Sequence, residues 1–448
     1  MKNALSLPFL TAVLWLGLTV NFTSASCLVH TGDPAPSADD PPPQHFDWEH
    51  NATGDWGGLR NLLSEHGVEI NGSYVTEPAG NPSGGFDQGI TYLHNIDLSL
   101  LLHLDRLVGI PHTTFLFTMS QRSGSSLSAK YIGNAISVQQ IFGGGETFRL
   151  VQMRLEHHLF DDRLTLAYGR LTATSDFLTS PLYCQFVNNG ICGQPPAPFF
   201  NMPDGITAYP AATWGALVEF KTTKETYIKG AVYDGDPNAG DDRHGANFGF
   251  GDNGVLLLWE IGCKPEQGLF SMPGRYSLGG YYHTGHFPDV ARDVTNGNIF
   301  LSGLAAQEHG AQEGFYLIVE QMLHRNPNSP KTGLNSFLTF VLSPEEDKSA
   351  IPYYLNGGLI YQGLIPGRPE DKTALGFYSA WFSSTLRGAQ RSAGLHGQTN
   401  ETDIEFNHQV QVNRWLYFRP NIQYVIKPNG LSSIRNALVL GVEAGVTF

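Results

Sequence analysis

Hydrophobic and polar side chains alternate along most of the chain, from Val68 to Phe448. A period of two places successive side chains on opposite faces of a β-strand. In the last segment, Glu443 and Thr447 fall on one face, with Val439 as an apolar exception there. The opposite face is apolar and carries Leu438, Leu440, Val442, Ala444, Val446 and Phe448. The alternation predicts about sixteen strands, which begin near Val68, Thr91, Thr113, Phe148, Arg163, Ala212, Tyr227, Val255, Tyr276, Phe315, Asn335, Tyr354, Thr373, Asp403, Trp415 and Ala437.

The connections between these predicted strands alternate in length. Tight connections occur at 160–162, 222–224 and 413–414. Longer ones lie between them and are rich in Gly, Asn and Pro; they cover roughly 122–147, 172–210, 237–254, 287–314 and 387–401. An up-and-down barrel with short turns on one rim and long loops on the other produces this rhythm.

A soluble β-sandwich would show the same alternation within its strands, so the two faces alone leave both folds open. A soluble β-protein of this size normally divides into domains, however, and no linker divides residues 68–448. The sequence therefore predicts an all-β, transmembrane, antiparallel up-and-down β-barrel. Aromatic residues near the predicted strand ends would form its interfacial girdles, and they include Trp214, Tyr282, Tyr378, Trp381, Trp415 and Tyr417.

The segment before the barrel begins with a predicted secretory signal peptide over residues 1–26. Lys2 is followed by an apolar run over about residues 5–20 and by small residues at 24–26, which is the order of such signals. The apolar run is short for a membrane anchor. Cys27 could suggest a lipoprotein, but Ser24 stands where a lipid-attachment site normally has Leu.

Two further segments complete the predicted organisation. Residues 27–52 are rich in Pro and Asp and predict a flexible N-terminal segment. Residues 53–67 predict a short periplasmic helix that Thr53 or Asp55 caps and Gly67 ends. Residues 68–448 then form the predicted barrel domain.

Composition and net charge restrict the classes of partner that the protein could bind. The chain has 448 residues, 51 Gly and only 15% charged residues, a balance that suits strands and turns. The formal net charge of −14 argues against nucleic acid as a partner. No cofactor or metal site is predicted. An exported chain with four Cys points to an oxidising compartment, where Cys184 and Cys192 would form a disulfide or remain free thiols.

Several blocks of residues, in one order along the chain, resemble the carbohydrate-selective porins of the OprB family. The opening block is residues 53–60, TGDWGGLR, and the second is 166–171, LAYGRL, followed by Asp176-Phe177. The most specific block is 357–371, GGLIYQGLIPGRPED, and the last is 420–430, PNIQYVIKPNG. The resemblance covers residues 53–448.

The resemblance implies a sixteen-stranded barrel in the outer membrane of a Gram-negative bacterium, through which small sugars diffuse down their gradient. Extracellular loops would fold inward over a narrow, partly charged constriction. The expected surroundings are outer-membrane lipid and lipopolysaccharide, with assembly machinery that reads the C-terminal strand. A monomer or weak oligomer is expected. The Cys184 and Cys192 pair departs from the family pattern, which leaves the shape of the constriction open.

Ionisable and amide side chains on the polar faces of the strands are the candidate lining of the water path. On a lipid face each charge would cost a few kcal/mol at the midplane, so the lumen is the expected side. The alternative is that they form ion pairs that stiffen the wall and never touch a sugar. The pair Arg154 and Glu156 is the preferred constriction. The full set is Arg154, Glu156, Glu219, Glu405, Arg419, Gln423 and Glu443.

The connection over residues 172–210 is the loop expected to fold inward. It combines aromatic and amide side chains, the mixture that sugars need, at Tyr183, Phe186, Asn188, Asn189, Phe199, Phe200 and Asn201. A cap over the outer mouth without sugar contact is equally open.

Other functions remain to be weighed against the sugar pore. A general small-solute or organic-anion porin would have the same barrel. A barrel-based lipid hydrolase would need a nucleophile beside His on one face, and no such arrangement stands out. His157 and His158 point to opposite faces of one strand, and 345–347 is a charge run on a polar connection. A soluble carbohydrate-binding β-protein would be extractable without detergent.

Overall fold

The computed structural model describes residues 51–143, 146–203, 205–236, 250–251, 253–327 and 329–448. The predicted signal peptide, residues 1–26, and nearly all of the predicted flexible segment, residues 27–52, lie outside these residues. Within them, no helix is both long and apolar enough to cross a bilayer.

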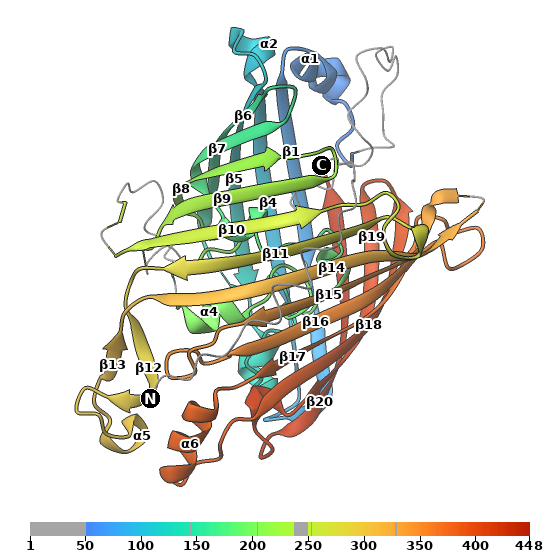
Figure 1. Cartoon of the computed structure of the whole chain (residues 1–448). Helices are drawn as coiled ribbons and strands as arrows, with labels where there is room; N and C mark the ends of the chain where they lie inside the picture. The colour runs from blue at the N-terminus through green and yellow to red at the C-terminus, as the bar shows by residue number, and fades with distance from the viewer. Residues whose placement is uncertain (1–50, 144–145, 204, 237–249, 252, 328) are drawn as a thin grey trace.

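The described chain forms one closed antiparallel barrel (Figure 1). Strand β1 (Val68–Thr76) pairs with β4 (Leu93–His103) on one side and with β20 (Arg435–Thr447) on the other, which closes the sheet. The ladder continues through β5 (Thr113–Gly124), β6 (Phe148–Leu159), β7 (Leu164–Leu171), β8 (Thr213–Lys221), β9 (Thr226–Asp234), β10 (Val255–Cys263), β11 (Gly274–His283), β14 (Gln312–Asn326), β15 (Ser329–Leu342), β16 (Tyr353–Gln362), β17 (Lys372–Trp381), β18 (Asn400–Asn413) and β19 (Leu416–Ile426).

Sixteen wall strands result, although the sheet contains 18 strand segments. The first wall strand is split into β1 and β2 (Ala79–Gly85) at Pro78, which has no N–H for the ladder. The second is split into β3 (Gly89–Thr91) and β4. The predicted barrel is therefore confirmed. The largest error in a predicted start is at Asn335, six residues into β15, because Pro330 and Gly333 interrupt the alternation at the start of that strand.

The two rims differ as the loop lengths predicted (Figure 1). One rim has short turns and carries α1 (Leu59–Glu65), preceded by η1 (Trp56–Gly58), and α2 (Leu104–Val108). The other has long loops that include the hairpin β12 (Phe287–Asp293) and β13 (Ala306–His309), α5 (Ile299–Ser302) and α6 (Ser384–Ser392). In barrels of this class the short turns face the periplasm.

The N-terminal helix is present, but its start differs from the prediction. The N-cap residue is Gly58, and no side chain caps it. Asp55 instead accepts a hydrogen bond from the backbone N–H of Asn61 at 3.3 Å. Gly67 follows the helix with a φ of 85°, the left-handed conformation that glycine adopts readily. Gly67 therefore follows the helix as predicted, and Asp55, one of the two predicted caps, is the N-cap residue of the preceding η1.

The last strand has the two predicted faces. Leu440 and Val442 are 49% and 40% exposed on the outside, whereas Glu443 is 1% exposed and faces inward. Val439, the apolar exception, also faces inward and packs in a cluster with Leu127 and other buried residues. An outward apolar band is what lipid requires, and the exception arises because a loop inside the barrel supplies apolar partners.

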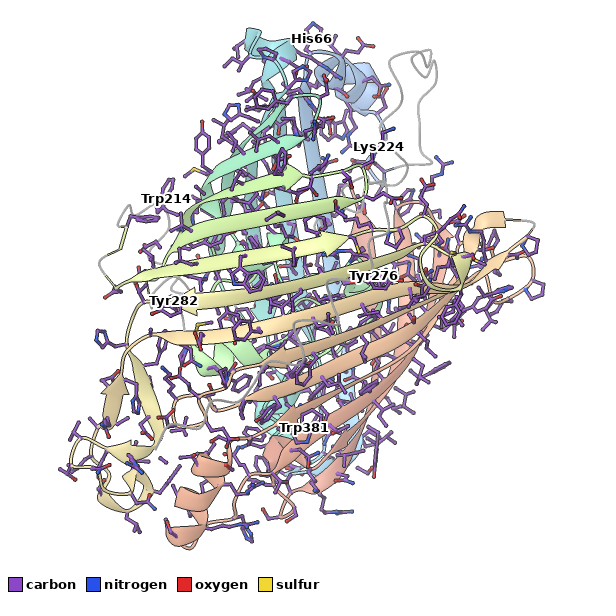
Figure 2. All side chains as sticks on the ribbon, in the orientation of Figure 1. His66, Trp214, Lys224, Tyr276, Tyr282 and Trp381 are labelled. Carbon is purple, nitrogen blue, oxygen red and sulfur yellow. The ribbon has the colours of Figure 1, made fainter. Side chains whose placement is uncertain are left out.

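The predicted aromatic girdles are partly wrong. Figure 2 labels Trp214, Tyr282 and Trp381 towards the long-loop rim, and the last two are 43% and 38% exposed. Tyr378 is fully buried and donates a hydrogen bond to Glu401 inside the barrel. Tyr417 likewise donates to Glu443. These two tyrosines are part of the polar network of the lumen wall.

One predicted face is interrupted in β6. Alternation counted from Arg154 places Val151 outside with Met153 and Leu155, but Val151 is fully buried. The register between β5 and β6 shifts between Thr118 and Met119, which leaves an extra residue in β6. Such a bulge reverses the alternation beyond it, so positions before Val151 point the opposite way from the prediction.

Candidate constriction and the contacts that hold it

Two long connections, described over residues 125–143 and 146–147 and over residues 172–203 and 205–212, fold into the barrel and bury many of their side chains there. Their buried residues join the largest apolar cluster, which includes Phe177, Tyr183 and Phe186. The ring of Phe186 lies edge-on to Phe337 of β15, with 6.0 Å between centroids. The inward fold that was predicted for residues 172–210 is therefore present.

Two glycines of the wall make room for the ring of Phe186. A Cβ at Gly358 of β16 would lie 2.8 Å from Phe186 Cζ, and one at Gly376 of β17 would lie 2.5 Å from Phe186 Cε1. Either distance is too short for two carbons in contact. Gly358 belongs to the most specific sequence block, so this part of the block shapes the seat of the loop.

A row of buried carboxylates on β18 holds both loops by their backbones. Glu405 accepts hydrogen bonds from the N–H of Val187 at 3.0 Å and of Asn188 at 2.8 Å. Glu401 accepts from the N–H of Ala135 and Ile136 at 2.7 and 3.0 Å. Charge-assisted bonds to backbone N–H groups are among the stronger hydrogen bonds in proteins.

Asn188 links the loop to two neighbouring strands. Its Nδ2 donates to Asp403 at 2.8 Å and to Gln423 of β19 at 2.9 Å. Gln423 in turn donates to the carbonyl of Val138 at 3.0 Å. Asn188 is fully buried, so it is a structural tie between the two loops and the wall and has no contact with the water path.

Arg419 and Glu443 form a second buried pair on β19 and β20. Arg419 Nη1 lies 2.8 Å from Glu443 Oε1, and their side chains are 6% and 2% exposed. Arg419 also donates to Gln409. Together with Glu405 and Gln423, these residues point inward as predicted but are covered by the loops. Arg419 and Glu443 thus form an ion pair within the wall, which is the arrangement that the alternative expects for such groups.

Another part of the wall, at β6, holds the beginning of the same loop. Arg154 Nη1 lies 2.8 Å from Asp176 of α3 (Ala173–Asp176), and Arg154 Nη2 lies 2.6 Å from Glu156. Glu156 also pairs with His158 at 3.0 Å. Arg154 therefore bridges its own strand and the start of the loop.

Glu219 is the remaining predicted lumen residue. It lies on β8 opposite Lys229 of β9 and is half-buried on the inward side, between the exposed Val218 and Phe220. Lys229 itself pairs with the fully buried Glu260 at 3.0 Å. Glu219 thus lies on the wall beside Lys229, which donates a hydrogen bond to the carbonyl of Asp176 at the start of the loop.

Two arginines that the sequence reasoning missed also face inward. Arg122 at the end of β5 and Arg149 at the start of β6 are 8% and 5% exposed, and their charges lie within range of each other. Arg122 Nε donates to Asn95 at 3.1 Å, and the guanidinium lies 5.3 Å from the centre of the Tyr209 ring. Among the described residues, no carboxylate lies within ion-pair distance of Arg122.

The inward orientation of these two arginines does not follow from the alternation alone. Alternation counted back from Arg154 places Arg149 on the lipid side, and the bulge at Val151 turns it inward. Arg122 fell at the first position of a predicted connection, where no face was assigned. A single sequence gives no clear signal for a bulge such as the one in β6. An Arg at the end of a predicted strand, such as Arg122, could be assigned to the inward face because a charge on the lipid face is costly.

Residues 87–448 match the protein family described as carbohydrate-selective porin, OprB family. The chain belongs to this family. Porin B of Pseudomonas aeruginosa is 30% identical over 417 residues, which cover 88% of this chain and 90% of that protein. The high-pH structure of Pseudomonas putida OprB is 27% identical, with a TM-score of 0.83 over 89% of this chain and 99% of that chain. The low-pH structure of the same protein has 23% identity and a TM-score of 0.58, with the same coverage.

The most specific OprB block also contains a clamp on the short-turn rim. Arg368 donates to both carboxylate oxygens of Asp371 at 2.7 Å and to the carbonyl of Gln411 at 2.9 Å. Burial raises the pKa of Asp371, but the bonds from Arg368 and from the Gln411 N–H outweigh it and leave the pKa below its usual range. The arginine therefore ties the turn between β16 and β17 to β18.

We expect Arg368→Ala to lower the thermal unfolding temperature of this porin in detergent by a few degrees, because Asp371 and the carbonyl of Gln411 lose the hydrogen bonds that the guanidinium donates. A depressed carboxyl pKa stabilises the fold above the unfolded value of about 3.9 and stops doing so as pH falls through the folded value. Wild type and variant should therefore converge below about pH 4. Equal unfolding temperatures of wild type and Arg368→Ala at pH 7 would show that the hydrogen bonds of Arg368 do not stabilise the barrel.

Proposed function

We propose that this porin is a passive outer-membrane channel for small sugars, whose narrowest part lies beside Arg122 and Arg149. The observation that carries the proposal is the environment of Arg122: a nearly buried guanidinium that stacks on Tyr209 and has no carboxylate within ion-pair distance among the described residues. A nearly buried guanidinium with no carboxylate in contact is costly to desolvate, although the charges of Asp97 and Glu77 reduce this cost. Water in the lumen, or a solute that passes through it, would supply the missing acceptors.

The side chains of Arg122 and Tyr209 offer the kinds of contact that a sugar can make. Guanidinium N–H groups can donate to hydroxyl oxygens, and the ring of Tyr209 can pack against the apolar face of a pyranose. Asp97 and Glu77 lie close enough for their charges to act on Arg122, which reduces the positive potential that would favour an anion. Binding stays weak, as conduction requires, because each contact is single and exchangeable with water.

The alternative is a general or organic-anion pore, which the two neighbouring arginines could also serve. Liposome swelling separates the two: the initial rate with a neutral hexose is compared with that of an organic anion of similar size and of a disaccharide. We expect the hexose to enter several-fold faster than either. Faster entry of the anion, or equal rates for all three, would favour the alternative.

The remaining features of the proposal concern the setting of the channel. Export would use the signal peptide predicted over residues 1–26. The assembly machinery would read the C-terminal strand, where Phe448 donates to Gly72 and its carbonyl accepts from Arg60 at 2.7 Å. Lipid and lipopolysaccharide would surround a monomer or weak oligomer. The proposal includes no enzymatic step, so incubation with lipids or glycans should leave them intact.

A further inference from the structure

Four of the short turns carry large apolar side chains that lie exposed at the rim of the barrel. They are Val108 at the end of α2, Phe160 between β6 and β7, Phe270 between β10 and β11, and Leu364 between β16 and β17. Each of these side chains is half exposed or more. Single exposed apolar residues need no explanation, but a set that recurs on one rim marks a surface that meets an apolar partner.

The two phenylalanines also have an unusual backbone. Phe160 and Phe270, the latter in η5 (Leu269–Ser271), have φ angles of 55° and 59°, which are uncommon for a bulky residue. Their side chains are 73% and 74% exposed, so contacts within the protein do not offset the cost of this conformation. With Trp56 of η1, they are the only Phe, Tyr or Trp residues with a positive φ in the part of the chain that the structure describes. All three lie on the short-turn rim.

The strands that adjoin the two phenylalanines are short for a bilayer. β7 has eight residues and β10 has nine, whereas a transmembrane strand needs about 9–11 residues at a tilt of about 45°. The turns at 160–163 and 264–273 therefore begin at the edge of the hydrocarbon core. By contrast, β14 and β15 have 15 and 14 residues and extend past the neighbouring turns (Figure 1). The end of β14 on this rim carries the exposed polar residues His324 and Arg325.

The apolar turns continue the lipid-facing band of the wall. On β10 the outward residues Leu257, Trp259 and Ile261 are 40–44% exposed, and this row leads towards the turn that carries Phe270. On β6, Leu159 is exposed directly before Phe160. The outward band and the tips of these turns therefore form one continuous apolar surface.

The spread of the four turns around the barrel indicates the kind of partner. They follow β4, β6, β10 and β16, and the β8–β9 turn and the β14–β15 hairpin, both with polar ends, stand between them. The β8–β9 turn carries the exposed Lys224 (Figure 2), whose long stem lets its ammonium reach water from an interface. A protein partner would need one contiguous apolar patch, whereas a lipid leaflet meets the barrel on every side.

We propose that these four turns are immersed in the inner, phospholipid leaflet of the outer membrane and form the girdle of the short-turn rim. Phe160 and Phe270 lie at the boundary between headgroups and acyl chains, where aromatic side chains bind lipid. Arg163, in the same turn as Phe160, has its guanidinium 5.7 Å from the centre of the outward Phe220 ring, and it can donate to a lipid phosphate there. Trp214, Tyr282 and Trp381 have the corresponding place on the long-loop rim.

Photolabelling of the wild-type chain tests this contact. The porin is reconstituted into vesicles of phosphatidylethanolamine and phosphatidylglycerol that contain a phospholipid with a diazirine near the glycerol end of its acyl chain. After irradiation, mass spectrometry should find label at 159–160 and 269–270 at a level similar to that at 257–261 of β10. Label at 324–326 of the long hairpin should be several-fold lower. Label on β10 without label at Phe160 and Phe270 would overturn the proposal.

Fluorescence quenching gives a second test with a matched control. Phe160→Cys, Phe270→Cys and Arg325→Cys are each made in a chain whose native cysteines are replaced by Ser, labelled with a small fluorophore and reconstituted in the same vesicles. Iodide on both sides of the membrane should quench the label at Arg325→Cys several-fold more strongly than the other two, and a phospholipid with a doxyl group near its headgroup should show the reverse order. Equal quenching by iodide at all three positions would place the turns in water and overturn the proposal. Neither readout depends on sugar conduction.

Discussion

Replacing Glu405 with Ala is expected to raise the single-channel conductance about twofold or more and to make the current unsteady. The variant leaves the N–H groups of Val187 and Asn188 without their acceptor. Each buried unsatisfied group costs about 1–3 kcal/mol, so the segment should detach from β18 and widen the path. Glu405→Gln keeps an acceptor oxygen and should have a smaller effect.

Glu219→Gln is the matched control for this prediction, because Glu219 is an inward-facing Glu of the wall that holds no part of the loop. Its conductance should stay within about a third of wild type by the same reasoning. Heat-modifiable migration on electrophoresis shows whether each barrel is assembled. An assembled Glu405→Ala channel with wild-type conductance and noise would show that the β18 carboxylates do not hold the loop.

Replacing Arg122 with Ala is expected to weaken the block of the current by glucose about tenfold, a loss of about 1.4 kcal/mol, and to raise the conductance. The side chain that donates to the sugar and narrows the path is removed, while Asn95 and Tyr209 remain. Arg122→Lys should recover the conductance but little of the block, since a single ammonium lacks the planar fork of donors.

Arg163→Ala is the control, because Arg163 lies on a short turn with its guanidinium 5.7 Å from the centre of the Phe220 ring, far from the loop. It should leave both conductance and block unchanged. Arg154→Ala gives a further contrast: it frees Asp176 and should affect noise more than block. Equal glucose block in wild type and Arg122→Ala would remove Arg122 from the constriction.

The fold could be predicted because it depends on patterns that repeat. The period of two, the alternation of short and long connections and the closing strand at Phe448 each constrain a closed barrel, and nearly every strand start was found within a few residues. The break at Pro78 and the bulge at Val151 are local, and one residue out of register reverses a face. The bulge accounts for the error in β6, and the break at Pro78 divides the first wall strand.

The candidate site could be predicted only as a set of inward positions. Alternation placed Glu405, Arg419, Gln423 and Glu443 inside the barrel correctly, but it could not show that the loop covers them. Whether an inward carboxylate meets water or a backbone N–H depends on where residues 187–188 come to rest. The position of these loop residues is set by tertiary packing, including the space at Gly358. No local sequence pattern predicts it.

We infer that the inward loops leave a narrow path on which small sugars compete with ions. It is tested most directly by single-channel recording in a planar bilayer, with glucose titrated on one side. We predict small, steady conductance steps that glucose reduces in a saturable manner at millimolar concentrations, and loss of this block in Arg122→Ala. A large conductance that high millimolar glucose leaves unchanged would contradict the account.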